Sequence, residues 1–136
     1  MTIEGTVRGQ IGKGFLVLLG VAPEDTEAQA KRLADKIGSL RVFEDEAGKM
    51  NLDLASVGGS VLVVSQFTLF ANCKKGNRPS FVGAAGPDVA IPLYERFMEL
   101  LREKGFTVEH GEFGAFMQVS SVNNGPVTIL MDTDQL

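Results

Sequence analysis

The 136-residue sequence contains one cysteine, one histidine, one tyrosine and no tryptophan. A single cysteine excludes an internal disulfide framework and any metal site built from a cysteine cluster. A single histidine excludes the common multi-histidine zinc sites and leaves little room for a histidine-based triad. Aromatic stacking surfaces would have to be built from the nine phenylalanines. The composition therefore disfavours enzymes that depend on a metal bound by several cysteines or histidines, or on a histidine-based triad.

Long apolar runs are also lacking. The longest, Phe15 to Ala22 (FLVLLGVA), has eight residues and contains a glycine, whereas a membrane-spanning helix needs about 20. The polar N-terminus (MTIEGTVRGQ) has no apolar core of a signal peptide. We therefore expect a cytoplasmic protein without a membrane partner, in which Cys73 stays reduced.

Positive charge is in the minority, because thirteen basic residues face seventeen acidic ones and the net charge is −4. This balance disfavours charge-driven wrapping of duplex DNA, but it leaves room for a local basic patch that grips the end of one RNA. A chain of this length with 44% hydrophobic residues is expected to form one domain, residues 1–136, with its own core.

The hydrophobic pattern predicts strands alternating with two helices. One helix opens at Thr26 with a capping box to Gln29, and a second starts at Asp88, with Pro92 in its first turn, and ends at Gly105. The expected strands are Ile3–Arg8, Phe15–Val21, Leu40–Phe43, Val61–Phe70, Phe106–Glu109, Met117–Val122 and Val127–Met131. The predicted fold class is α/β, a single domain of mixed-sheet or barrel-like layers with both helices packed on one side.

The glycine-rich segment Gly9–Gly14 lies between two predicted strands. Phosphate-binding loops need a helix N-terminus after the loop, so a hairpin turn is the better interpretation of this segment.

Two segments carry polar groups where the pattern predicts strands and turns. Ser65, Gln66 and Thr68 interrupt an otherwise buried strand, which indicates either a polar network in the core or a functional site. The second segment, Asn123–Thr128, is either an ordinary turn or part of a cleft. Thr68 with His110 as its base would make a nucleophilic pair, although His110 equally suits a surface turn.

The densest basic cluster lies in the turn-rich loop Asn72–Pro79. Its cations are Lys74, Lys75 and Arg78, which either contact RNA phosphates or simply form a solvated loop. Cys73 beside the two lysines has no histidine near it in sequence and is best explained as incidental.

Several motifs together resemble the D-aminoacyl-tRNA deacylase family. The resemblance runs from about residue 8 to residue 132 and is carried most specifically by SQFTL and GPVT with RPSF between them. The residues that carry it are Gly12–Gly20 (GKGFLVLLG), Leu40–Asp45 (LRVFED), Gly48–Asn51 (GKMN), Ser65–Leu69 (SQFTL), Lys75–Phe81 (KGNRPSF), Phe113, Gly114, Met117 and Gly125–Thr128 (GPVT).

The resemblance implies a homodimer with a metal-free, cofactor-free active site at the subunit interface. Such an enzyme, a carboxylic ester hydrolase, hydrolyses the ester of D-aminoacyl-tRNA, or of glycine on alanine tRNA, and rejects L-aminoacyl-tRNA. Ser65, Gln66, Phe67 and Thr68 would form the catalytic strand end, and the amides of Phe67 and Thr68 would face the substrate carbonyl. Catalysis would be assisted by the terminal 2′-hydroxyl of the RNA, with Thr68 positioning the substrate rather than attacking it.

For selection between mirror-image substrates the resemblance points to the other segment. A cis Gly125–Pro126 pair would enter the neighbouring subunit's pocket and exclude an L side chain, with Phe113 and Met117 nearby. Family members usually begin with a further strand carrying a Val-Gln-Arg-Val-like segment, whose arginine helps to hold the Gly-Pro carbonyls. This sequence begins at Met1-Thr-Ile-Glu, and Asn124 stands where many members have Asp.

Two alternatives to the deacylase remain open at this stage. One is a catalytically impaired module that binds the acceptor end of tRNA, and the other is an esterase that uses Thr68 as its nucleophile.

Overall fold

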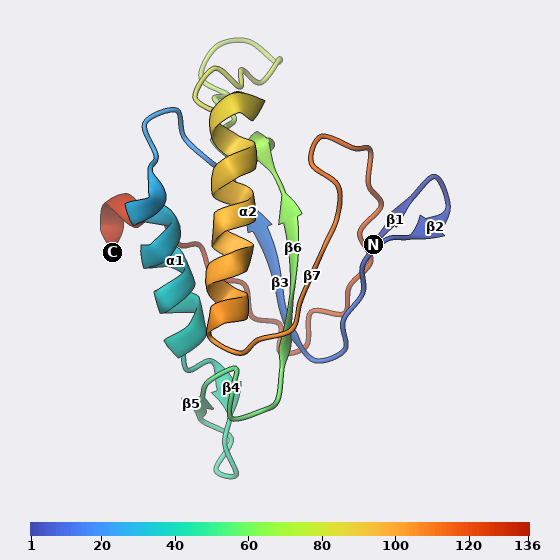
Figure 1. Ribbon diagram of the computed structural model, residues 1–136, viewed down its shortest axis with the longest axis vertical. Coiled ribbons are helices and arrows are strands. Elements are labelled where there is room, and N and C mark those ends of the chain that lie inside the picture. Colours follow the sequence, from blue (N-terminus) through green and yellow to red (C-terminus); the bar gives the residue numbers. More distant parts are fainter.

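A three-stranded parallel sheet covered on one face by two helices forms the centre of the molecule (Figure 1). The computed structural model describes all residues, 1–136. The sheet has the order β3–β6–β7, and the chain reaches each new strand through a crossover that contains a helix. The elements that build this layer are β3 (Gly14–Leu19), α1 (Glu27–Ser39), β6 (Ser60–Ser65), α2 (Pro87–Glu103) and β7 (Val108–His110). The predicted α/β class, with both helices on one side, is therefore confirmed.

Strand β6 is the middle strand because its apolar residues can be buried on both faces. Val61 to Val64 are all buried, as a continuous apolar run in a parallel sheet requires. Its register pairs Leu19 with Ser65 on one side and His110 with Val63 on the other. Strands β3 and β6 therefore end together, whereas β7 leaves the sheet two residues earlier.

The main core lies between the sheet and the helices. Phe97 and Leu101 of α2 pack with Ala34 of α1 against Val61 and Val63 of β6. Alternate residues of β6, Leu62 and Val64, point to the opposite face, where they meet a smaller cluster. This second cluster is completed by Met1, Ile3, Ile11, Ala115 and Met117.

The helix starts follow local chemistry. The side chain of Thr26 accepts a hydrogen bond from the amide of Ala28, and the Gln29 side chain returns to the Thr26 amide, so the predicted capping box is confirmed. Helix α2 begins one residue earlier than predicted, because Pro87 occupies the first helical position, where the missing amide costs nothing. Pro92 consequently lies in the second turn rather than the first. Gly105, at φ +93°, follows the helix end as predicted.

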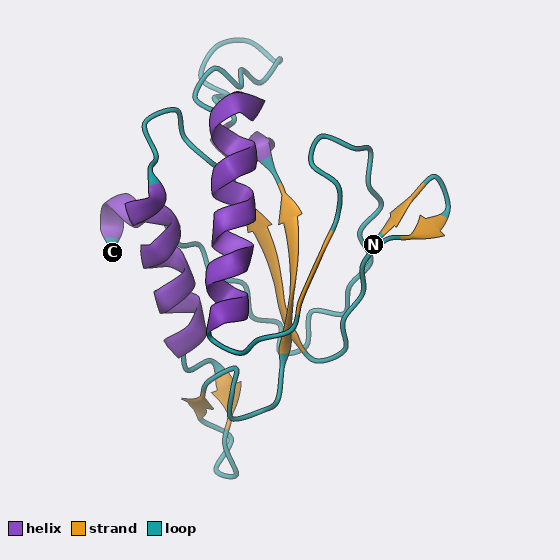
Figure 2. Cartoon of the chain, viewed as in Figure 1, coloured by secondary structure: helices purple, strands orange, loops and turns teal.

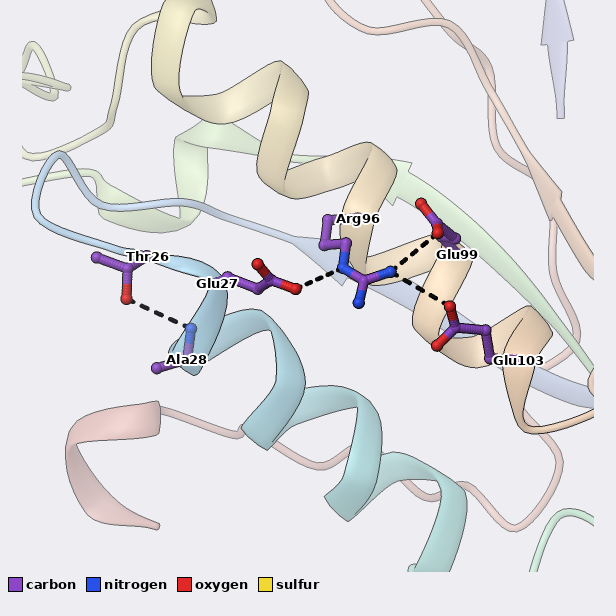
Figure 3. A network of polar contacts seen from close by, with 6 residues as sticks. All are labelled: Thr26, Glu27, Ala28, Arg96, Glu99 and Glu103. Atoms are coloured by element: carbon purple, nitrogen blue, oxygen red, sulfur yellow. Dashed lines mark hydrogen bonds and ion pairs between the residues drawn. The ribbon is translucent and has the colours of Figure 1, made fainter.

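A cluster of charges ties the two helices together at the surface. The Arg96 guanidinium lies 2.7 Å from Glu27 of α1 and also contacts Glu99 and Glu103 of its own helix (Figure 3). The hydrogen bond from Glu27 raises the pKa of Arg96 further above its ordinary value, so this cation stays charged. Lys104 makes a second link between the helices, at 2.6 Å from Asp35.

The remaining elements are short. Asp45 lies in the turn between two short strands and accepts hydrogen bonds from the backbone amides of Ala47 and Lys49. The bond from Lys49 holds the pKa of the Asp45 carboxyl below its ordinary value. No helix is both long and apolar enough to cross a membrane. The elements outside the central layer are β1 (Thr2–Ile3), β2 (Thr6–Val7), β4 (Phe43–Glu44), β5 (Met50–Leu52) and the 3-10 helices η1 (Phe67–Phe70) and η2 (Thr133–Gln135).

Several predicted strands are wrong in extent. The predicted strand Ile3–Arg8 is a tight hairpin, β1 and β2, that turns at Glu4 and Gly5, both at positive φ. Of Leu40–Phe43 only Phe43 is in a strand, and of Phe106–Glu109 only the last two residues are. The predicted strand Val61–Phe70 stops at Ser65 and continues as η1, so its second half has no strand alternation.

The C-terminal part departs furthest from prediction. Met117–Val122 and Val127–Met131 form no strands, and after β7 the chain is mostly loop (Figure 2). The one ladder contact here is a bridge between Thr2 and Gln118. Their β-branched residues favour strands, but within one chain they find no partner, and Val122 and Leu130 are about nine-tenths exposed.

The predicted hairpin turn Gly9–Gly14 is also wrong, since β2 and β3 belong to different sheets. Gly9 is buried against β7, where a Cβ atom would lie 2.7 Å from the His110 carbonyl oxygen. The segment is therefore a crossing over the sheet rather than a turn.

Candidate functional site

A cavity of about 210 Å³ opens where β3 and β6 end. This is the usual place for ligands in open parallel sheets, outside the carboxyl ends of the strands. Because β7 leaves the sheet early, the chain after it, rather than another strand, makes the far wall. The lining residues are Leu19, Val21, Val64, Ser65, Gln66, Phe67, Ala85, Ala90, Tyr94, Phe113, Gly114, Ala115, Met117 and Val119.

The near wall is the junction between β6 and η1. The amide of Gln66 still bonds to the Leu19 carbonyl at 2.8 Å, and then the backbone turns into the 3-10 helix. The first amides of such a helix, here those of Phe67 and Thr68, have no acceptor within it. Gly20 allows this close turn, since a Cβ atom there would lie 2.8 Å from the Phe70 ring.

Thr68 is not part of this wall. It does not line the cavity, and its hydroxyl is hydrogen-bonded to the side-chain amide of Gln66. His110 does not line the cavity either, and its Nδ1 lies 2.6 Å from the Gly111 carbonyl oxygen. No hydrogen bond joins Thr68 to His110, so the structure does not contain the pair that a Thr68 nucleophile with a His110 base would need.

The far wall contains the phenylalanine and the methionine that were predicted from the sequence. Phe113 and Met117 line the cavity together with Ser65 and Gln66. Gly125 and Pro126 do not line it; they lie in an exposed turn whose peptide bond is cis.

Side chains of that turn hold its shape. The Asn123 side chain accepts a hydrogen bond from the Val127 amide at 3.1 Å and donates to the Thr128 hydroxyl at 2.9 Å. The structure thus separates the two predicted halves of the site within one chain.

The basic loop adjoins the cavity without entering it. Residues 71–80 are all exposed, and a two-way backbone bridge between Asn72 and Ser80 closes the loop. Lys74, Lys75 and Arg78 make no ion pair, so their charges are uncompensated. Phe81, which follows the loop, contacts Phe67 of the cavity wall edge-on, with ring centroids 5.1 Å apart.

Tyr94 of α2 is a lining residue that the sequence did not indicate. Its ring packs against Phe113 with centroids 6.0 Å apart, and its hydroxyl donates to the Val63 carbonyl at 3.2 Å. Burial raises the pKa of its phenol to about 12. In the sequence it follows Leu93 of the apolar stripe of the helix. That position beside the stripe was the only local indication that Tyr94 is buried.

The walls offer little acid–base chemistry. Eleven of the fourteen lining residues are hydrophobic, and no carboxylate, histidine or amine is among them. No group of three His, Cys, Asp or Glu side chains is arranged to hold a metal ion. The cavity can therefore enclose and orient a substrate, but its side chains provide no base for proton abstraction.

Comparison with known proteins identifies the family. The model of the family described as D-Tyr-tRNA(Tyr) deacylase matches residues 1–132. The chain belongs to this family. It is thereby a member of a hydrolase family, in agreement with the resemblance that its motifs carry.

Individual relatives cover nearly the whole chain. A D-aminoacyl-tRNA deacylase of Bacillus velezensis is 56% identical over 99% of this chain and 92% of the relative. A Bacillus subtilis protein named inactive D-aminoacyl-tRNA deacylase is 55% identical over 96% of this chain and 99% of the relative. Among solved structures, the c-Myc DNA Unwinding Element Binding Protein has a TM-score of 0.87 at 42% identity, covering 96% of this chain and 90% of that one.

The phenol of Tyr94 provides a direct test of the cavity's burial. Because its pKa is raised to about 12, it should ionise about two units above an exposed tyrosine, with no tryptophan to mask its absorbance change. The unfolded chain loses this proton near pH 10, so the stabilisation is complete below pH 10 and is lost between about pH 10 and 12. A spectrophotometric titration that ionises at pH 10 in the folded protein would contradict the buried placement.

Proposed function

We propose that the protein hydrolyses D-aminoacyl-tRNA to the free D-amino acid and tRNA, and that it rejects L-aminoacyl-tRNA. The observation that carries this proposal is the cavity at the carboxyl end of β6, lined by Ser65, Gln66 and Phe67 in a chain of the deacylase family. The acyl carbon–oxygen bond breaks, while water adds a hydroxyl group to the acyl carbon and a proton to the ribose oxygen. Glycine attached to alanine tRNA is a second substrate, because it presents no side chain to exclude.

The chemistry suits a cavity without a side-chain base. An aminoacyl ester is already activated, so holding it still and stabilising its oxyanion supply much of the rate. We assign oxyanion stabilisation to the amides of Phe67 and Thr68, which lack acceptors within η1. The proton transfers are assigned to water and the terminal 2′-hydroxyl of the RNA. No cofactor is required for this scheme.

Thr68 acts by position in this scheme. The side-chain amide of Gln66 donates a hydrogen bond to its hydroxyl, and no histidine or carboxylate is hydrogen-bonded to it. A hydroxyl that accepts a hydrogen bond and has no base is a poor nucleophile.

Selection against L substrates is assigned to Gly125 and Pro126 of a second copy. Backbone carbonyls hold fixed positions, so they can bind the amino group of a D substrate and leave no room for an L side chain. Within one chain this turn is exposed and outside the cavity, which suits insertion into a partner's cavity, alongside Phe113 and Met117. Leu16 and Leu18 on the outer face of β3 remain exposed as well, as expected of a surface that a second copy covers.

The tRNA acceptor end is assigned to the basic loop. Lys74, Lys75 and Arg78 carry exposed, unpaired charges in an otherwise acidic chain, and Phe81 joins the loop to the cavity wall through Phe67. A phosphate backbone leading into the cavity fits this arrangement. We expect neither DNA nor a membrane as a partner, and we expect the protein to act in the cytoplasm.

A second candidate function is an inactive module that binds the acceptor end of tRNA. The observation that favours it is the inactive Bacillus subtilis relative, which this chain covers over 99% of its length. The two functions differ in turnover rather than in binding.

A deacylation assay of the purified protein decides between them. We expect release of D-tyrosine from D-tyrosyl-tRNA(Tyr) and of glycine from glycyl-tRNA(Ala), with L-tyrosyl-tRNA(Tyr) left intact. Binding of tRNA without release above the spontaneous rate would favour the inactive module. Sedimentation of the same preparation tests the shared site, since a monomer that turns over and still discriminates would contradict the role of a second copy.

Replacing Thr68 by valine tests its role. Valine keeps the shape and removes the hydroxyl, so we expect kcat/KM to fall by no more than about tenfold, far below the roughly million-fold loss typical of a removed nucleophile. Thr107→Val, at an exposed position remote from the cavity, is the matched control. A folded but inactive Thr68→Val protein, or an acyl group on Thr68 detected by mass spectrometry, would reverse the assignment.

Salt dependence tests the basic loop. The double variant Lys74→Ala/Lys75→Ala should weaken tRNA binding and make the slope of log affinity against log salt shallower by about 1.5, since each phosphate contact contributes roughly 0.7–0.9. Lys36→Ala/Lys49→Ala changes the net charge equally at two exposed sites elsewhere and should leave the slope unchanged. Equal slopes for the two double variants would remove the loop from the binding surface.

A further inference from the structure

Tyr94 occupies the point where β7 separates from β6. Its side chain is 4% exposed, and its hydroxyl donates to the carbonyl oxygen of Val63 at 3.2 Å. The same oxygen accepts the Gly111 amide at 3.3 Å, which is the last hydrogen bond between β6 and the chain that continues from β7. The hydroxyl and the Gly111 amide therefore converge on one oxygen, so Tyr94 holds the Val63 carbonyl at the point where a long and correspondingly weak strand contact ends.

The position of Gly111 is passed on to the far wall of the cavity. A Cβ atom on Gly111 would lie 2.4 Å from the Met117 sulfur, so this side chain rests directly on the Gly111 backbone. The ring of Tyr94 meets Phe113 edge-on, which fixes a second residue of the same wall. Tyr94 thus touches this wall directly at Phe113 and reaches Met117 indirectly, through the Gly111 backbone.

We propose that Tyr94 is a positioning residue for the deacylase, which sets the distance between the wall of Ser65–Phe67 and the wall of Phe113–Met117. The inference rests on the proposed function and adds a residue to it. It assigns to the hydroxyl a role that shape alone does not require, because phenylalanine would fill the same space.

Protonation of the hydroxyl is consistent with this role. Burial raises the pKa of the phenol to about 12, so the group remains a donor throughout the pH range in which an aminoacyl ester survives. The Arg102 charge and the Gly111 amide both lower this pKa, but only as smaller effects than burial. The hydrogen bond from the Tyr94 hydroxyl to the Val63 carbonyl is therefore permanent and does not depend on pH in this range.

The test is the Tyr94→Phe variant, which keeps the ring against Phe113 and removes only the hydroxyl. Small displacements of positioning groups reduce turnover more than binding, so we expect kcat for D-tyrosyl-tRNA to fall about 5- to 20-fold with KM within twofold of the wild type. The control is Ile37→Val, a truncation in the core on α1 that does not line the cavity. The Tm of both variants is measured so that stability loss and kcat loss can be compared.

Hydrogen exchange of the Gly111 amide gives a readout that does not depend on turnover. Faster exchange in Tyr94→Phe than in Ile37→Val, with the kcat loss confined to Tyr94→Phe, supports the proposal. Unchanged kcat in Tyr94→Phe, or an equal loss in both variants, overturns it. If the wild type itself releases no D-amino acid, the proposed function has failed. Unchanged Gly111 exchange in Tyr94→Phe then also overturns the positioning role. Faster Gly111 exchange in Tyr94→Phe alone still supports the role of the hydroxyl in holding this wall.

Discussion

The burial of β6 on both faces is the constraint on which the rest of the structure depends. A parallel strand with neighbours on both sides must be apolar throughout, and Val61 to Val64 satisfy this by packing into two separate clusters. Where the apolar run stops, at Ser65, the sheet has to stop as well. The backbone then turns sharply at Gln66, and the amides that the sheet no longer uses become available next to a hollow lined by the same core residues. Site and core are therefore continuous.

The chemistry that this cavity can support follows from the lack of carboxylates, histidines and amines among its lining residues. Burial raises the pKa of Tyr94, and the apolar lining would equally disfavour the charged form of any acid or base placed there. Such a pocket suits the proposed reaction, in which the substrate ester carries its own activation. The charged groups stay outside, in the loop after η1 and in the network around Arg96 that joins the helices.

Local signals predicted much of this, and long-range packing accounts for the rest. The capping box at Thr26 and the apolar stripes of both helices depend on residues three or four apart, so they are legible in the sequence. The change from strand to 3-10 helix after Ser65 depends on Gly20 and Phe70 approaching each other, which no local pattern encodes. The prediction of two C-terminal strands was wrong because β-branched residues such as Val122 and Ile129 favour strands only when a partner strand lies beside them. Motifs located Ser65, Gln66, Phe67, Phe113 and Met117 at the cavity, whereas Tyr94 was missed because helix periodicity does not distinguish a core residue from a lining residue.

The order of strands in the central sheet also governs when the cavity can exist. Every pairing joins distant parts of the chain, Leu16 with Leu62 and Val61 with Val108, so the sheet has a high contact order and no local hairpin to nucleate it. The far wall follows β7, the last strand to leave the ribosome, and nothing made earlier can replace it. A nascent chain can therefore pair β3 with β6 before it can enclose a ligand, because the lining residues on α2 and after β7 are made later. The cavity is thus a property of the finished chain and is absent from a partly synthesised one.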